Sequence, residues 1–192
     1  VKPALAPSLA VLDEIRADPT IRRLLFCGVG CAVQAFRAVE HLLGLDEVYV
    51  LGTNCADNSP TPRAAQTFVR EGLGADETKV LGYEFMQDFR VHVKLQDGAD
   101  GAIKYDKKPY FTLPGTIAKQ SIAGSCLACF DYTNGLADAV VGYMAAPLAR
   151  GGTMTSSPQT LTVRNARGAA MADAAVRRGR LRVEEIAGGS GG

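Results

Sequence analysis

Apolar and polar positions along the first part of the chain follow a helical period, then a strand pattern, and then both again. Apolar residues three apart predict a short amphipathic helix over 8–16, and a continuous apolar run predicts a buried strand over 22–27. Helical spacing resumes at residue 32 and ends at Gly44, a natural helix terminator. A second apolar run covers 48–52. This order predicts a β–α–β unit with two parallel strands.

The middle of the chain changes to shorter, alternating patterns. Thr61-Pro62 predicts the N-cap and first turn of a helix that runs to about Gly72. Residues 80–85 resemble a strand, and 91–95 alternate so that His92 would lie on an exposed side. A turn-rich link then leads to an extended stretch at 109–113. These features predict an antiparallel β insert.

The last part of the chain predicts an apolar strand over 137–143, a final strand over 161–165 and a helix over 168–178. The expected fold class is therefore α/β, with a parallel β–α–β core and an antiparallel β insert. We expect a main domain over 1–170 and a terminal helix with a glycine-rich tail over 171–192.

Composition and charge narrow the class of protein. Hydrophobic residues make up 47% of the chain and charged residues 21%, as in ordinary globular proteins. The net charge of +1 argues against a nucleic-acid partner or a polybasic membrane surface. No apolar run has the length of a transmembrane segment. The chain starts at Val1 without methionine or a readable targeting segment, so we expect a fragment of a larger protein.

Five cysteines are the main candidates for chemistry, and their odd number prevents complete disulfide pairing within the chain. Cys126 and Cys129 form a C-x-x-C pair, which supplies half of a four-thiolate site. Cys31 and Cys55 each follow a predicted parallel strand, where neighbouring strand ends meet. Spacing alone leaves structural zinc, an iron–sulfur cluster and a redox disulfide open. Cys27, within an apolar run, is expected to be a small core side chain.

Gly28-Val29-Gly30 lies between a predicted strand and a predicted helix, as in the glycine-rich turn of dinucleotide-binding folds. The third glycine of that fingerprint is replaced by Val33, so the fingerprint fails. The turn could still hold an anion at a helix N-terminus.

Taken in order, these motifs resemble the beta subunits of coenzyme F420 hydrogenase and dehydrogenase, together with their photosynthetic relatives. The likeness covers roughly residues 1–170. The segments that carry it are Leu24–Cys31, Tyr49–Cys55, Tyr83–Phe89, Cys126–Asn134, Leu136–Met144 and Thr162–Asn165.

The resemblance implies a larger iron–sulfur flavoprotein with [4Fe–4S] clusters and FAD, reduced ferredoxin as electron donor, and a chloroplast location. It implies Cys31, Cys55, Cys126 and Cys129 as cluster ligands, and so selects Cys31 over Cys27. The cysteine-rich N-terminal segment with which the family would hold another cluster is absent from this sequence. Ala32 stands where the family usually has glutamine.

The implied reaction is the reduction of a chlorophyll-type tetrapyrrole. Thr53-Asn54-Cys55 and the stretch 154–165 favour reduction of a 7-hydroxymethyl group to methyl. Reduction of an 8-vinyl group, an F420-linked oxidoreductase and a zinc-stapled α/β binding module without redox chemistry are the alternatives.

Removing a hydroxyl as water requires two electrons and a proton donor. Asp131, Tyr132 and Asp138 are the polar candidates for the catalytic acid, because they lie nearest the C-x-x-C pair in the sequence. Flavin carbonyls and phosphates suit amide and guanidinium partners, for which the candidates are Asn134, Arg164 and Asn165.

Overall fold

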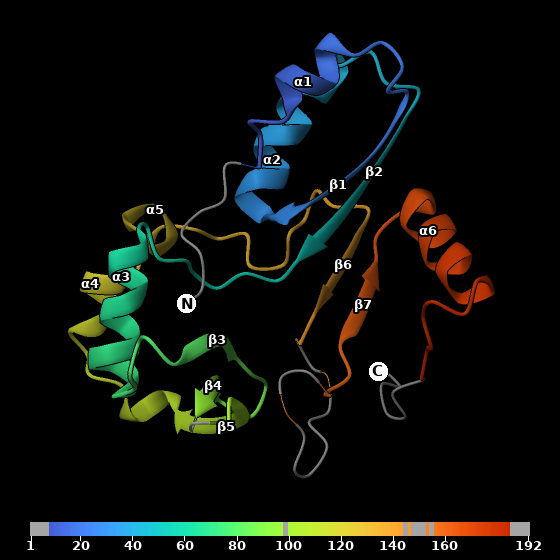
Figure 1. Ribbon diagram of the computed structural model, residues 1–192. Helices are drawn as coiled ribbons and strands as arrows, with labels where there is room; N and C mark the ends of the chain where they lie inside the picture. Colours follow the sequence, from blue (N-terminus) through green and yellow to red (C-terminus); the bar gives the residue numbers. More distant parts are fainter. Residues whose placement is uncertain (1–7, 98–99, 144–145, 147–152, 154–155, 185–192) are drawn as a thin grey trace, which may run out of the picture.

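The computed structural model describes residues 8–97, 100–143, 146, 153 and 156–184 (Figure 1). Its strands are β1 (Arg23–Val29), β2 (Glu47–Thr53), β3 (Val80–Phe85), β4 (Arg90–Asp97), β5 (Ala102–Pro109), β6 (Ala139–Gly142) and β7 (Thr160–Val163). Its α-helices are α1 (Leu12–Ala17), α2 (Gly30–Val39), α3 (Pro62–Thr67), α4 (Ile117–Ser121), α5 (Gly124–Leu127) and α6 (Ala166–Arg177). Three further turns of helix are η1 (Glu40–Leu42), η2 (Phe68–Leu73, of π type) and η3 (Tyr110–Thr112).

The main sheet has the strand order β1-β2-β6-β7. Strands β1, β2 and β6 run parallel, and β7 is antiparallel to β6. The register of β1 and β2 extends from Arg23 opposite Glu47 to Val29 opposite Thr53, so both strands end at the same level. The predicted parallel β–α–β core is confirmed.

The core of this unit lies between the main sheet and helices α1 and α2 (Figure 1). Phe36 of α2 stacks on Phe26 of β1, with ring centroids 4.3 Å apart and an interplanar angle of 4°. Val33, one turn earlier in α2, is fully buried with Val50 of β2. Each such side chain contributes about 1.5–3 kcal/mol through burial, so this apolar contact holds α2 on the strands.

Strands β3, β4 and β5 form a separate antiparallel sheet in that order. Phe68 and Ile117, from η2 and α4, pack against its Val91 and Val93. The predicted antiparallel insert is thus confirmed, but its last strand is β5 rather than 109–113, where η3 follows. Strand β5 is an edge strand rich in exposed lysine, so it lacks the apolar alternation that would have revealed it.

His92 corrects a second expectation, because its side chain is buried rather than exposed. It belongs to β4, the central strand of the three, and lies on the face opposite Val91 and Val93, so both faces of the strand are covered at this position. Its Nε2 lies 2.9 Å from Asp88 Oδ2. This partner lies four residues away, across the turn before β4, and it bonds one nitrogen of a ring that the alternating pattern assigned to solvent. The other nitrogen, Nδ1, is buried without a hydrogen-bond partner among the described residues.

Side chains at the helix starts explain two of the predicted boundaries. Thr61 Oγ1 accepts the N–H of Ala64 at 3.1 Å, with Pro62 at the first position of α3. Asn165 Oδ1 accepts the N–H of Gly168 at 3.0 Å, so α6 begins two residues before the predicted start. A helix also occupies 117–121, where the sequence had indicated none. Within the described ranges, no helix is both long and apolar enough to cross a bilayer.

One buried carboxylate joins the main sheet to two helices. Asp138, 1% exposed, accepts the backbone N–H of Val50 at 2.7 Å. It also accepts hydrogen bonds from Arg37 Nη2 of α2 at 2.9 Å and from Asn165 Nδ2 beside α6 at 2.8 Å. Three donors therefore compensate the buried negative charge.

The substitution Asp138→Ala should lower the free energy of unfolding by about 3–5 kcal/mol, because it leaves three donors without their acceptor. Arg37, one of the three, would keep a single ion pair, with Glu40. Urea unfolding checks this. Asp173→Ala, on the exposed side of α6, is the matched control and should change stability by no more than about 0.5 kcal/mol. A loss for Asp138→Ala as small as that of the control would contradict the structural role of this carboxylate.

Candidate functional site

The candidate site lies at the carboxyl edge of the parallel strands. Strand β1 leads directly into α2, whose second residue is Cys31. Strand β2 ends at Thr53, two residues before Cys55. Because Val29 and Thr53 are paired in register, the segments that carry both cysteines leave the sheet side by side.

The C-x-x-C pair occupies two successive tight turns. The N–H of Cys126, in α5, donates to the carbonyl of Ala123 at 2.9 Å, and the N–H of Cys129 donates to the carbonyl of Cys126 at 3.2 Å. Cys126 is partly buried and Cys129 is exposed. Both thiols therefore belong to one short, hydrogen-bonded segment.

Two backbone hydrogen bonds hold the loop after β2 to this segment, one on each side of the C-x-x-C pair. The N–H of Ala123 donates to the carbonyl of Asn58 at 2.9 Å. The N–H of Cys55 donates to the carbonyl of Tyr132 at 3.3 Å. The loop of Cys55 and the segment of Cys126 and Cys129 consequently run next to each other.

A turn at residues 131–135, which we call the Asp131 turn, connects this segment to the strand ends. Its Asn134 is fully buried and has a φ of 55°, in the left-handed region. Asn134 Nδ2 donates to the carbonyl of Gly28 at 2.9 Å and approaches that of Thr53 at 3.4 Å. One side-chain amide thus bridges the ends of β1 and β2.

Asp131 begins the turn and lies against the first residues of α2. Its Oδ2 accepts Gln34 Nε2 at 2.7 Å, and its Oδ1 accepts the N–H of Gly135 at 2.8 Å. A Cβ at Gly30 would lie only 2.7 Å from Oδ2, so this approach requires glycine. A carboxylate is favourable at a helix N-terminus. The chain's own Asp131 carboxylate therefore lies beside the glycine-rich turn.

The side chains of the four predicted ligands are not assembled into a ready-made metal group. All five cysteines are free thiols. In the part of the chain that the structure describes, no three His, Cys, Asp or Glu side chains are grouped closely enough to hold a metal ion. The backbone brings together the segments of Cys31, Cys55, Cys126 and Cys129, and their role as ligands stays a prediction.

Cys27 is exposed, which corrects its expected place in the core. Neighbouring Phe26 is buried against α2, and strand alternation turns the next side chain outward. Cys27 lines a hollow of about 620 Å³ that Cys31, Thr53 and Asn58 also line.

Each of the three predicted flavin contacts makes at least one hydrogen bond within the chain. Asn134 bridges two strand ends, and Asn165 caps α6 and donates to Asp138. Arg164 Nη2 donates to the carbonyl of Thr133 at 2.6 Å. Of these side chains, only Asn134 keeps a buried polar atom, Oδ1, without a hydrogen-bond partner among the described residues. Arg164 and Asn165 are exposed, whereas Asn134 is fully buried, and the flavin role of all three stays a prediction.

The candidate acids differ in how many hydrogen bonds their side chains accept and in how exposed they are. Asp138 is buried and bonded to three donors, and both oxygens of Asp131 are bonded. Tyr132 is 42% exposed. Tyr110 lies near it, and burial raises the pKa of Tyr110 from 10.0 to about 12, with further contributions from the charges of Asp57 and Tyr132.

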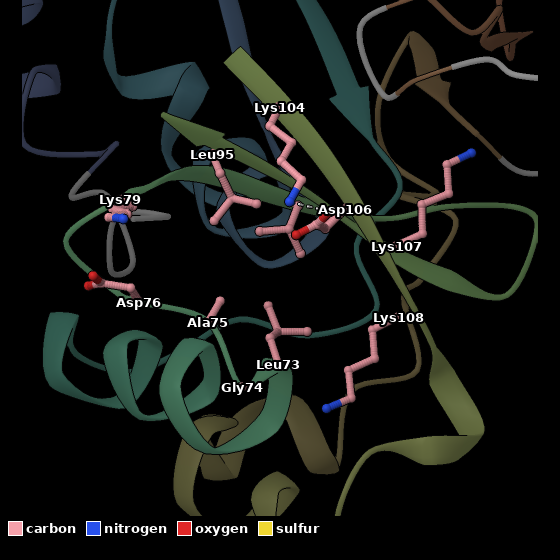
Figure 2. Close-up of a pocket in the computed structure, with 11 residues that line it drawn as sticks. Leu73, Gly74, Ala75, Asp76, Lys79, Leu95, Lys104, Asp106, Lys107 and Lys108 are labelled. Atoms are coloured by element: carbon pink, nitrogen blue, oxygen red, sulfur yellow. Dashed lines mark ion pairs between the residues drawn. The ribbon is translucent and has the colours of Figure 1, made fainter. Parts of the chain in front are cut away.

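A second hollow, of about 410 Å³, lies between the end of η2 and the sheet β3–β5 (Figure 2). Its wall is apolar at Leu73 and Leu95 and carries several lysines. Lys104 is paired with Asp106 at 3.7 Å, and Figure 2 shows the ammonium groups of Lys107 and Lys108 pointing in different directions. These lysines protect an edge strand and do not converge on one point.

Two of the residues that shape the site were not predicted from the sequence. Gln34 and Asn58 have no local motif, because their partners are 97 and 65 residues away in the chain. Asn134-Gly135 did carry a signal, since an Asn-Gly pair is typical of a tight turn with positive φ.

Comparison with known proteins identifies the family. Residues 21–188 match the family formed by the C terminus of the coenzyme F420 hydrogenase/dehydrogenase beta subunit. The chain belongs to this family. The family resemblance inferred from the ordered motifs is therefore confirmed, and so is the α/β fold class.

Two relatives and one solved structure define the range of similarity. The chain is 52% identical over 171 residues to a chloroplastic 7-hydroxymethyl chlorophyll a reductase of rice, Oryza sativa subsp. japonica. It is 49% identical over 146 residues to an uncharacterized protein of the cyanobacterium Nostoc sp. PCC 7120. These matches cover 89% and 76% of this chain, and the chain spans about a third, 35%, of each relative.

The F420-reducing [NiFe] hydrogenase complex from Methanosarcina barkeri contains a chain of the same fold, with a TM-score of 0.70 and 18% sequence identity. The match covers 93% of this chain and 57% of that chain. At this identity the likeness concerns the fold alone.

The raised pKa of Tyr110 predicts a stability change in alkaline solution. Above pH 10 the unfolded phenol ionises while the folded one stays protonated until about pH 12, so the free energy of unfolding falls as pH rises through this interval. Tyr110→Phe should remove that part of the decrease. Urea unfolding at several alkaline pH values, with phenolate absorbance of both proteins, checks this. Identical pH profiles for the two proteins would contradict it.

Proposed function

We propose that this chain holds an iron–sulfur cluster within an oxidoreductase, with Cys31, Cys55, Cys126 and Cys129 as its ligands. The observation that carries the proposal is the pair of backbone hydrogen bonds that ties the loop of Cys55 to both sides of the C-x-x-C pair. The shared level at which β1 and β2 end adds Cys31 to the same edge. The Asp131 turn connects the segments that carry these four thiols.

The donor set supports this chemistry. Thiolates are the ligands that iron–sulfur clusters prefer, and four of them complete the common ligand set of a [4Fe–4S] cluster. A bound cluster supplies one-electron transfer. Structural zinc, held by the same four thiols in a binding module without redox activity, is the alternative that uses the same residues.

The proposed reaction of the whole protein is the ferredoxin-dependent reduction of a 7-hydroxymethyl group on a chlorophyll-type pigment. The identity of 52% to the rice 7-hydroxymethyl chlorophyll a reductase supports this substrate, and the chloroplastic location of that relative supports a chloroplast. In the balanced reaction, R–CH₂OH takes up two electrons and two protons to give R–CH₃ and water.

FAD belongs to the proposal because ferredoxin donates single electrons and the reaction needs a pair. A bound flavin supplies storage of two electrons. Asn134 is fully buried between two strand ends, whereas Arg164 and Asn165 are exposed, so these two are the better candidates for contacts with the flavin.

Within this chain, the surface beside the C-x-x-C pair suits an apolar, planar substrate. Phe130 is 92% exposed and Leu127 is 64% exposed, and large apolar side chains gathered on a surface mark interaction sites. Tyr132 has an accessible ring and a phenol that can donate a proton. We propose Tyr132 as the acid for the departing hydroxide, ahead of the fully bonded Asp131 and Asp138.

Two other reactions fit the same cluster site. An 8-vinyl reductase would saturate a C=C bond on a related pigment, and an F420-linked enzyme would use a deazaflavin. Incubating the full-length protein with reduced ferredoxin and each pigment, or with reduced F420, separates the three.

The cysteine variants test the cluster itself. In the full-length protein purified without oxygen, Cys31→Ser, Cys55→Ser, Cys126→Ser and Cys129→Ser should each lower iron and acid-labile sulfide per chain. They should also lower the visible absorption that bleaches with dithionite. Cys27→Ser is the matched control, because Cys27 is an exposed thiol in the same hollow as Cys31 and should leave iron unchanged.

Stoichiometric zinc in a colourless protein would overturn the redox function and favour the binding module. If Cys27→Ser lost iron and Cys31→Ser kept it, Cys27 would replace Cys31 as the assigned ligand.

A further inference from the structure

We infer that Asn134 is a positioning residue, which sets the separation of the two strand ends that carry Cys31 and Cys55. This inference rests on the proposed cluster and assigns a role to a side chain that does not itself bind metal. Asn134 Nδ2 donates to the carbonyl of Gly28, three residues before Cys31, and approaches that of Thr53, two residues before Cys55.

The surroundings of Asn134 leave its amide little freedom. The residue is fully buried, and a Cβ at Gly52 would lie only 2.5 Å from Nδ2. Strand β2 therefore approaches the amide as closely as a residue without a side chain permits. A shift of the amide would move the ends of both strands.

The same contacts oppose a role in holding flavin. Both hydrogen bonds of Nδ2 go to backbone carbonyls of the chain, and none of the side chain is exposed. The partnerless Oδ1 is buried with it. An external ligand would have to displace a strand end to reach this amide.

The backbone at Asn134 offers a clean way to remove the bridge. At a φ of 55°, glycine adopts the same conformation without strain. Asn134→Gly thus deletes the side chain while keeping the turn. Asn134→Asp keeps the shape but replaces the donor with a carboxylate oxygen that would face two carbonyl oxygens.

The experiment follows iron loss from the full-length protein to a chelator without oxygen, together with iron and FAD per chain. Asn134→Gly and Asn134→Asp should release iron about tenfold faster than the wild-type protein, as expected when a partner that orients metal ligands is removed. FAD per chain should stay unchanged. Thr61→Ala removes the N-cap of α3, away from the strand ends, and is the control for an ordinary loss of thermal stability.

Gly52→Ala provides an independent variant, because its added methyl group presses on the same amide from the strand side. It should also accelerate iron release, even if Asn134→Gly folds poorly. Wild-type release rates in all three variants would overturn the inference. Loss of FAD with iron retained would overturn it in favour of a flavin contact. A wild-type protein without iron would overturn the proposed cluster itself, together with the inference that depends on it.

Discussion

The Asp131 turn is the constraint on which the arrangement of this protein depends. Three segments that are distant in the sequence, at the ends of β1 and β2 and after the C-x-x-C pair, meet at this turn. Asn134 joins the two strands with one amide, and Asp131 lies against the start of α2. Gly30 allows the close contact with Asp131, and Gly52 allows the close contact with Asn134. The turn therefore packs against both strand ends at positions that have no side chain.

Two carboxylates connect the main sheet to its helices at different places. Asp131, at the carboxyl edge, orients the start of α2 through Gln34. Asp138, inside the unit, joins β2 and α2 with the start of α6 through Val50, Arg37 and Asn165. These hydrogen bonds fix α2 and the start of α6 relative to the strands, whereas Phe130, in the segment of the C-x-x-C pair, is exposed.

Local patterns in the sequence predicted the elements whose signal is local. The parallel strands, the caps at Thr61 and the segment of the C-x-x-C pair follow from apolar runs and short motifs. Burial of His92 could not be read from alternation, because alternation separates the two faces of a strand without revealing whether the polar face is also covered. The pairing of Arg37 with Asp138 spans 101 residues, and only the folded topology brings them together. Cys27 was misplaced because a short apolar run does not reveal which of its side chains face outward.

The central claim is that the Asp131 turn brings four thiols to one edge so that they share one iron–sulfur cluster. Iron K-edge X-ray absorption of the full-length protein, purified without oxygen, tests it most directly. We expect an iron signal with sulfur as the nearest neighbours and further iron atoms in the next shell. An iron signal dominated by nitrogen or oxygen neighbours, or a single metal ion without a metal neighbour, would contradict it.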